Sequence, residues 1–132
     1  MSNMVDVPTE ELTGLALDWA TDAATTGEAL KVLQKLDGSG KWMFFYKDAP
    51  FPQGPVKFST DSKQASALLE RYKPLLMWDA TEQWKCCITP EPNEPNYYFR
   101  QYGPTALIAL CRAIVARELG STTISVPKEL VS

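Results

Sequence analysis

The chain has 132 residues and no histidine, and this absence removes several kinds of catalytic site. Histidine is the usual base beside serine and cysteine nucleophiles and the commonest metal ligand. The three cysteines form no C-x-x-C pair, which disfavours a zinc site. Neither G-x-x-x-x-G-K nor G-x-G-x-x-G occurs, so the common phosphate-binding loops are missing too. We therefore expect a protein that is not an enzyme and that uses no cofactor or metal ion.

Extended runs of basic or apolar residues are also missing. The net charge is −3, and the lysines and arginines do not cluster in the sequence. Nucleic-acid binding usually needs a basic face, so this class of function is disfavoured. No apolar run is long enough to cross a membrane, and no signal-peptide pattern is present. An odd number of cysteines in such a chain predicts a reduced, cytosolic protein.

The longest apolar-periodic segment covers residues 102–120 and predicts a largely buried helix. Gly103 is expected at its N-cap, with Pro104 at the first helical position, where a missing N–H costs nothing. Gly120 follows the last periodic residue and predicts a left-handed C-cap. The apolar face has the i, i+3, i+4, i+7 spacing of a helix and consists of Leu107, Leu110, Cys111, Ile114 and Val115.

The other segments predict a mixture of helices and strands around this helix. Residues 1–7 are expected to form a flexible leader. Helices are predicted from position 9 with Thr9 as its cap, from 25 to 36 with a capping box of Thr25 and Glu28, and from 61 to 72. Strands are predicted over residues 41–47, 56–58, 75–78, 84–88, 97–102 and 122–126. Turns or loops are expected at 37–40, 49–55, 79–83 and 90–96, and a last helical turn at 127–130.

This order of elements predicts an α+β fold, and the length predicts a single domain over residues 1–132. The apolar run at 41–47 is nearly continuous, which is typical of a strand that is covered on both faces. We therefore expect a mostly antiparallel β-sheet with helices packed on both faces, an α/β/α sandwich.

Three blocks of the sequence carry a resemblance to a known family. They are T-E-E-L-T-G-L-A-L-D-W-A at 9–20, F-S-T-D-S-K-Q-A-S-A-L-L-E-R-Y at 58–72, and Y-G-P-T-A-L-I-A-L-C-R-A-I-V-A-R-E-L-G at 102–120 with V-P-K-E-L behind it. In this order they resemble NinX, a family of small tailed-phage proteins, and the broader phage alpha-beta-alpha sandwich domain. Residues 25–47 depart from the family pattern. The resemblance implies a phage origin, a sandwich fold and residence in the host cytoplasm, but no reaction.

Two predicted helix starts form the first candidate binding site. Ser59, Thr60 and Asp61 precede one helix, and Gly103 and Thr105 lie at the start of another. The N-terminus of a helix offers free N–H groups and a partial positive charge, so it can hold a phosphate or carboxylate. Ordinary N-capping is the alternative for either start. The carboxylate of Asp61 also argues against an anion nearby.

A strand face forms the second candidate site. Tyr98, Arg100 and Tyr102 share one face by alternation, so a base could stack on the rings and a phosphate could pair with the guanidinium. A solvated sheet face or edge is the alternative. The candidate ligand-binding residues are therefore Ser59, Thr60, Tyr98, Arg100, Tyr102, Gly103 and Thr105, and no catalytic or metal-ligating residue is assigned.

These patterns lead to three functional hypotheses. The first is a phage counter-defence protein that binds and sequesters a small anionic, nucleotide-type ligand without catalysis. The second is a protein-interaction module that inhibits a host enzyme or nuclease, with a host defence protein as its partner. The third is an enzyme that acts on a nucleotide, which would need a carboxylate or metal cluster that the sequence does not display. An exposed strand edge would also allow a homo-oligomer.

Overall fold

The computed structural model describes residues 4–26, 31–34, 42–45, 57–88, 99–120 and 123–131, with the backbone alone for 31–34, 42–45 and 129. The elements in chain order are β1 (Met4–Pro8), η1 (Thr9–Glu11), α1 (Gly14–Thr26), β2 (Lys31–Gln34), β3 (Trp42–Phe45), α2 (Ser62–Tyr72), β4 (Leu75–Asp79), β5 (Gln83–Ile88), β6 (Phe99–Gly103), α3 (Ala106–Leu119), β7 (Thr123–Pro127) and η2 (Lys128–Leu130).

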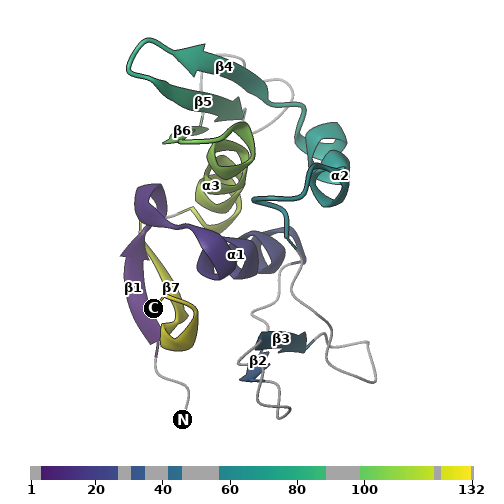
Figure 1. The fold of residues 1–132 in the computed structure, drawn as a ribbon, viewed down its shortest axis with the longest axis vertical. Coiled ribbons are helices and arrows are strands. Elements are labelled where there is room, and N and C mark those ends of the chain that lie inside the picture. The colour runs from purple at the N-terminus through teal and green to yellow at the C-terminus, as the bar shows by residue number, and fades with distance from the viewer. Residues whose placement is uncertain are drawn as a thin grey trace.

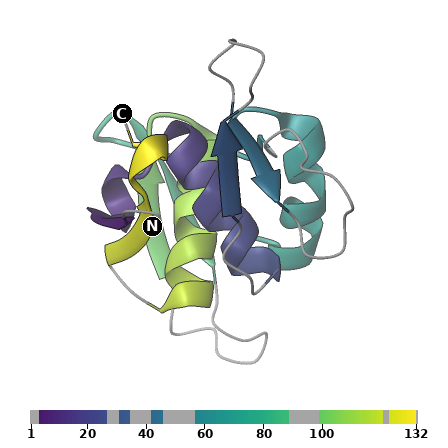
Figure 2. The same ribbon diagram turned by 90° about the horizontal axis from the view of Figure 1, so that it is seen from below.

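The described strands form three small antiparallel sheets. Strand β1 pairs with β7, β2 pairs with β3, and the third sheet has the order β4-β5-β6. Helix α3 packs against β5 and β6 on one side and against α1 on the other (Figure 1). Seen from below, α1 and α3 lie side by side, and the β2–β3 pair lies in front of α1 (Figure 2). The predicted α+β fold, with antiparallel strands and helices packed against the sheet, is confirmed.

Helix α3 is the centre of the core, as its apolar periodicity predicts. Leu110, Ile114 and Val115 have no exposed surface, because β5, β6 and α1 pack against α3. The helix ends at Gly120 in the left-handed conformation with φ 61°, as expected for a C-cap glycine. The N-cap prediction was wrong by two residues. Thr105 is the N-cap, since its hydroxyl accepts the Ile108 N–H at 3.2 Å, an interaction that glycine cannot make.

The N-terminal segment differs from the prediction of a flexible leader over residues 1–7. Residues 4–8 form β1, which pairs in register with β7, Met4 opposite Pro127 and Val7 opposite Ile124. The Ser125 hydroxyl also donates a hydrogen bond of 2.7 Å to the Asp6 carboxylate. Residues 1–3 lie outside the described residues. The partner strand is distant in the sequence, so no local pattern reveals the pairing.

The predicted second helix at 25–36 is also wrong. Thr25 lies in the last turn of α1, where its hydroxyl donates to the Asp22 carbonyl at 3.1 Å, and residues 31–34 form a strand. The hydroxyl of Thr25 therefore makes a hydrogen bond within α1, and Thr25 does not begin another helix. Glu28, the turn at 37–40 and the loops at 49–55 and 90–96 lie outside the described residues.

The middle of the chain follows the prediction more closely. Asp61 caps α2 through its carboxylate, which accepts the N–H groups of Lys63 at 2.9 Å and Gln64 at 3.3 Å. The predicted strand at 56–58 is wrong for residues 57 and 58, because the Lys57 carbonyl closes a turn by accepting the Asp61 N–H at 2.7 Å. The hairpin of β4 and β5, strand β6, strand β7 and the helical turn η2 are confirmed with small changes at their ends.

Candidate ligand-binding surface

The turn before α2 contains two of the predicted ligand residues, Ser59 and Thr60. Ser59 is 97 % buried, with 3 % of its surface exposed, and its N–H donates to the Asp18 carboxylate at 2.9 Å. Its hydroxyl oxygen makes no hydrogen bond of ordinary geometry with the described residues. Thr60 is exposed. Ser59 therefore ties this turn to α1, and only Thr60 is open to a ligand in solution.

The carboxylate of Asp18 is itself buried in α1, with 3 % of the residue exposed. Burial raises the pKa of Asp18 above its ordinary value, because a charged carboxylate loses its hydration there. The N–H and hydroxyl of Ser59 and the charge of Lys57 lower the pKa, and the nearby charge of Asp22 raises it further. The burial effect is the largest of these, so the folded protein holds the proton of Asp18 more tightly than the unfolded chain does.

This raised pKa predicts a pH dependence of stability. Because the folded state binds the proton more tightly, Asp18 favours folding at acid pH. That contribution is lost as the pH rises from 3.8 through the folded-state pKa. Asp18→Asn should remove this part of the slope, while its amide oxygen can still accept the Ser59 N–H. Urea unfolding gives the free energy of unfolding of both proteins across this pH range. The same dependence of this free energy on pH in the wild type and in Asp18→Asn would contradict the role of Asp18.

The start of α3 contains Gly103 and Thr105. Thr105 is exposed, but its hydroxyl already accepts the Ile108 N–H. Gly103 is buried against α3, where an added Cβ would lie 2.9 Å from both the Ala109 nitrogen and the Ile108 Cγ2. Gly103 thus allows the end of strand β6 to approach α3 closely. No hydrogen bond among the described residues joins this helix start to the turn before α2.

Arg112 is a buried cation that the sequence analysis did not select. It has 8 % exposed surface, its Nε donates to the Leu12 carbonyl at 2.9 Å, and its terminal nitrogen donates to the Tyr102 carbonyl at 2.7 Å. Burial lowers the pKa of the guanidinium, and the charge of Glu10 opposes this effect. Arg112 thus connects α3, the segment before α1 and the end of β6 through two hydrogen bonds within the protein.

The register of the three-stranded sheet decides which face carries Arg100 and Tyr102. Side chains alternate between the two faces of a strand, so Gly103, which contacts α3, lies on the opposite face from these two residues. Lys85 is directly opposite Tyr102, and Met77 is directly opposite Lys85. The face turned away from α3 thus carries Lys85, Arg100 and Tyr102 together, and we call this set the outer-face site. Tyr98 lies outside the described residues.

The outer-face site places two cations around one aromatic ring. Arg100 is exposed, while Lys85 and Tyr102 are half-buried. The neighbouring Cys87 thiol, and next the Tyr102 side chain, raise the pKa of the Arg100 guanidinium. Directly opposed residues have Cβ atoms about 4.5–5.5 Å apart, so Lys85 and Tyr102 can contact one ligand. Sequence reasoning missed Lys85, because the hairpin at 79–83 sets only the pairing of β5 with β4, whereas Lys85 meets Tyr102 through the pairing of β5 with β6.

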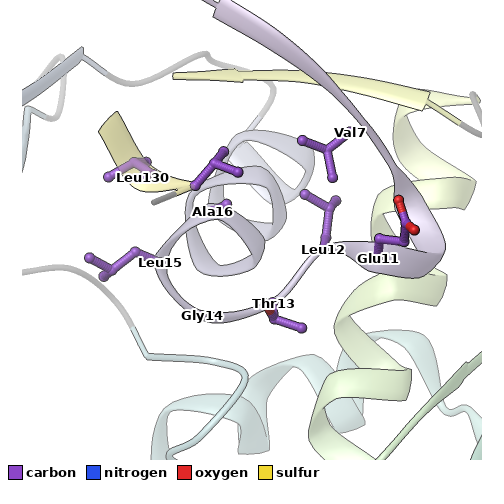
Figure 3. A pocket seen from close by; sticks show the side chains of 9 residues that line it. Val7, Glu11, Leu12, Thr13, Gly14, Leu15, Ala16 and Leu130 are labelled. Carbon is purple, nitrogen blue, oxygen red and sulfur yellow. The ribbon is translucent and has the colours of Figure 1, made fainter. Parts of the chain in front are cut away.

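A cavity of about 320 Å³ lies elsewhere, at the beginning of α1 (Figure 3). None of the predicted ligand residues lines it. One charged side chain, that of Glu11, is part of its lining, which consists of Val7, Glu11, Leu12, Thr13, Gly14, Leu15, Ala16, Leu130 and Val131. The carboxylate of Glu11 would repel the anionic ligand that the sequence suggests.

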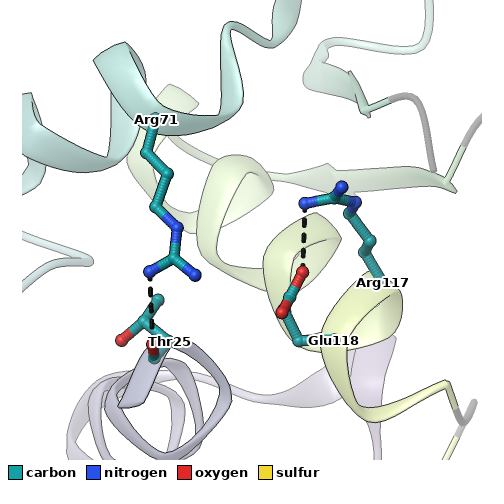
Figure 4. A network of polar contacts seen from close by, with 4 residues as sticks. All are labelled: Thr25, Arg71, Arg117 and Glu118. Carbon is teal, nitrogen blue, oxygen red and sulfur yellow. Dashed lines mark hydrogen bonds and ion pairs between the residues drawn. The ribbon is translucent and has the colours of Figure 1, made fainter. Parts of the chain in front are cut away.

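Two other arginines meet at the carboxyl ends of the helices (Figure 4). Arg71 donates to the Thr25 carbonyl at 3.2 Å, and Arg117 pairs with Glu118 at 3.0 Å. The guanidinium carbons of these arginines lie 5.1 and 5.3 Å from the centre of the Tyr72 ring. Cations at helix C-termini offset the partial negative charge there, so we assign this cluster to stability.

Comparison with known proteins leaves the family open, because neither a protein-family model nor a curated protein matches this chain. The resemblance to NinX therefore stays a prediction. Among the described residues, no helix combines the length and apolarity needed to span a bilayer. Within the same residues, aspartates, glutamates and cysteines do not gather in a group of three or more that could hold a metal ion.

Proposed function

We propose that this protein is a phage accessory protein that binds a small anionic, nucleotide-type ligand on the outer-face site. The observation that supports the proposal best is the sheet register, which sets Lys85 opposite Tyr102 and Arg100 beside them on the same face. The phage origin, the counter-defence role and the host cytoplasm as its location rest on the three sequence blocks that resemble NinX.

The three side chains supply complementary parts of a nucleotide site. A guanidinium such as that of Arg100 can form two parallel hydrogen bonds to a phosphate. The ammonium of Lys85 adds a second positive charge with freely rotating donors. A base can stack on an aromatic ring such as Tyr102, a contact that contributes about 1–3 kcal/mol per base. Such a site binds its ligand by charge and stacking, and it therefore sequesters the ligand chemically unchanged.

Isothermal titration with a panel of linear and cyclic nucleotides tests this proposal. Arg100→Ala should weaken binding of the best nucleotide about 10- to 100-fold, the effect of losing a charged hydrogen bond. Arg71→Ala is the matched control, because Arg71 is also exposed but belongs to α2. The nucleotide should be recovered unchanged after incubation. Absence of heat with every nucleotide, or equal losses in the two variants, would argue against the outer-face site.

The second candidate function is a protein-interaction module that inhibits a host enzyme or nuclease. The observation in its favour is the exposure of Leu75 and Trp78, at 54 % and 58 %, because tryptophan often anchors protein interfaces. In that case Trp78→Lys should abolish inhibition of the host protein, while Arg100→Ala should leave the inhibition intact. Loss of nucleotide binding in Arg100→Ala, with nucleotide binding kept in Trp78→Lys, supports the first candidate.

A further inference from the structure

Strand β4, which follows α2 in the chain, is an edge strand of the three-stranded sheet. It pairs with β5 on one side, and no strand of the described residues pairs with it on the other. Natural edge strands are usually protected by lysines, prolines or bulges, because their free N–H and C=O groups can pair with another chain. The five residues of β4 are L-L-M-W-D, four of which are apolar, and the one charged side chain, that of Asp79, lies at the end of the strand.

The side chains of β4 are also unusually exposed for their type. Five large apolar residues are exposed in the described part of the chain, and two of them, Leu75 and Trp78, belong to this strand. The Trp78 ring contacts the Trp84 ring edge to face, with the centroids 5.8 Å apart. Trp78 is therefore held in position without being covered, and a partner would lose little side-chain entropy by packing against it.

We propose that the occupant of this edge is a second copy of the same chain, paired antiparallel about a twofold axis through Leu76. In this register Leu75 of each copy lies opposite Met77 of the other. Lys73, the left-handed residue that ends α2 just before the strand, is then next to Asp79 of the other copy, within reach of its long side chain. The symmetry makes every one of these contacts twice. The alternative register centred on Met77 brings Leu76 opposite Trp78, but it also places Leu75 opposite the Asp79 carboxylate and leaves that charge without a cation. The Leu76-centred register is therefore favoured by charge.

The pairing has a consequence for the shape of the assembly. Two three-stranded sheets would join into one six-stranded sheet in which both β4 edges are covered. The two outer faces would then be continuous, so the Lys85, Arg100 and Tyr102 side chains of both copies would lie on one face of one sheet. The dimer does not depend on the proposed ligand, and it can be tested without one.

Sedimentation equilibrium of the full chain over a wide range of concentration tests the dimer. The wild type should reach twice the mass of one chain as the concentration rises. Trp78→Lys and Leu75→Lys should stay monomeric while keeping the wild-type circular dichroism spectrum, because both side chains are exposed. Leu119→Lys is the matched control, since Leu119 is 41 % exposed at the end of α3, and it should still form dimers.

A charge exchange tests the register. Lys73→Glu and Asp79→Lys should each weaken the dimer, because each variant places like charges next to one another, and the double variant should restore it. Failure of the double variant to recover the dimer overturns the Leu76-centred register. A wild type that stays monomeric at every concentration overturns the dimer itself, as does a dimer that survives Trp78→Lys. A monomeric chain that binds an unrelated protein through β4 overturns it as well.

Discussion

Replacing Arg112 with methionine should lower the free energy of unfolding by about 2–3 kcal/mol. The methionine keeps most of the apolar stem but removes both donors, which leaves the Leu12 and Tyr102 carbonyls without their partner. Part of this loss of stability is offset, because the substitution also removes the free-energy cost of burying the charged guanidinium. The free-energy cost of the two unpaired carbonyls should exceed that gain, because both carbonyls remain in the protein without a hydrogen-bond donor. Urea unfolding measures the difference.

Two further variants show whether the hydrogen bonds of Arg112 carry this effect. Arg112→Lys keeps the charge but loses the planar fork, so its loss of stability should be intermediate. Arg71→Met is the matched control, because Arg71 also donates to a carbonyl, that of Thr25, but at an exposed site. Its effect should stay within about 0.5 kcal/mol. Equal effects at positions 71 and 112 would show that burial of the bond does not matter.

Gly103→Ala should destabilise the fold by about 3 kcal/mol, at the upper end of overpacking changes. The new methyl group would lie 2.9 Å from the backbone nitrogen of Ala109, which cannot move unless α3 moves with it. Since Tyr102 and Arg100 precede Gly103 in β6, the displacement should also disturb the outer-face site. Thermal or urea unfolding measures the first effect, and nucleotide titration measures the second.

Gly120→Ala is the control for Gly103→Ala. Gly120 has φ 61° and no atom within 4 Å of an added Cβ, so the substitution meets conformational strain without a clash. Its cost should be about 1 kcal/mol, the usual penalty for a non-glycine residue in the left-handed region. It should leave nucleotide binding unchanged, because Gly120 lies at the end of α3 that is remote from β6. A Gly103→Ala protein as stable as Gly120→Ala would argue against the close approach of β6 to α3.

The elements that sequence analysis predicted well are those whose signals are local. Helix α3 is recognised by its own apolar periodicity and by Gly120, and α2 by the Asp61 cap within its own first turn. The β4–β5 hairpin is likewise specified by two apolar runs around a short polar turn. In each case the interacting groups are separated by a few residues, so the pattern is visible in one window of sequence.

The errors occurred where pairing with another strand decides the conformation. Strand β1 exists because β7 pairs with it, and β2 exists because β3 pairs with it. Residues 4–8 carried too weak a local signal to predict a strand, and the helical spacing in residues 29–36 was overridden by the pairing of β2 with β3. The N-cap of α3 was misplaced for a different reason: glycine and threonine are both acceptable caps, and the close packing of Gly103 on the helix reserved it for β6.

The sequence by itself determined that α3 would be buried, that Asp61 would begin a helix, and that Arg100 and Tyr102 would share one strand face. These features follow from periodicity and capping, which need only neighbouring residues. Only the tertiary structure decided that Lys85 lies opposite Tyr102, that Ser59 is bound to Asp18, and that Arg112 serves two distant carbonyls. Such pairs form when separate segments bury their polar groups against one another, and no single stretch of sequence contains both partners.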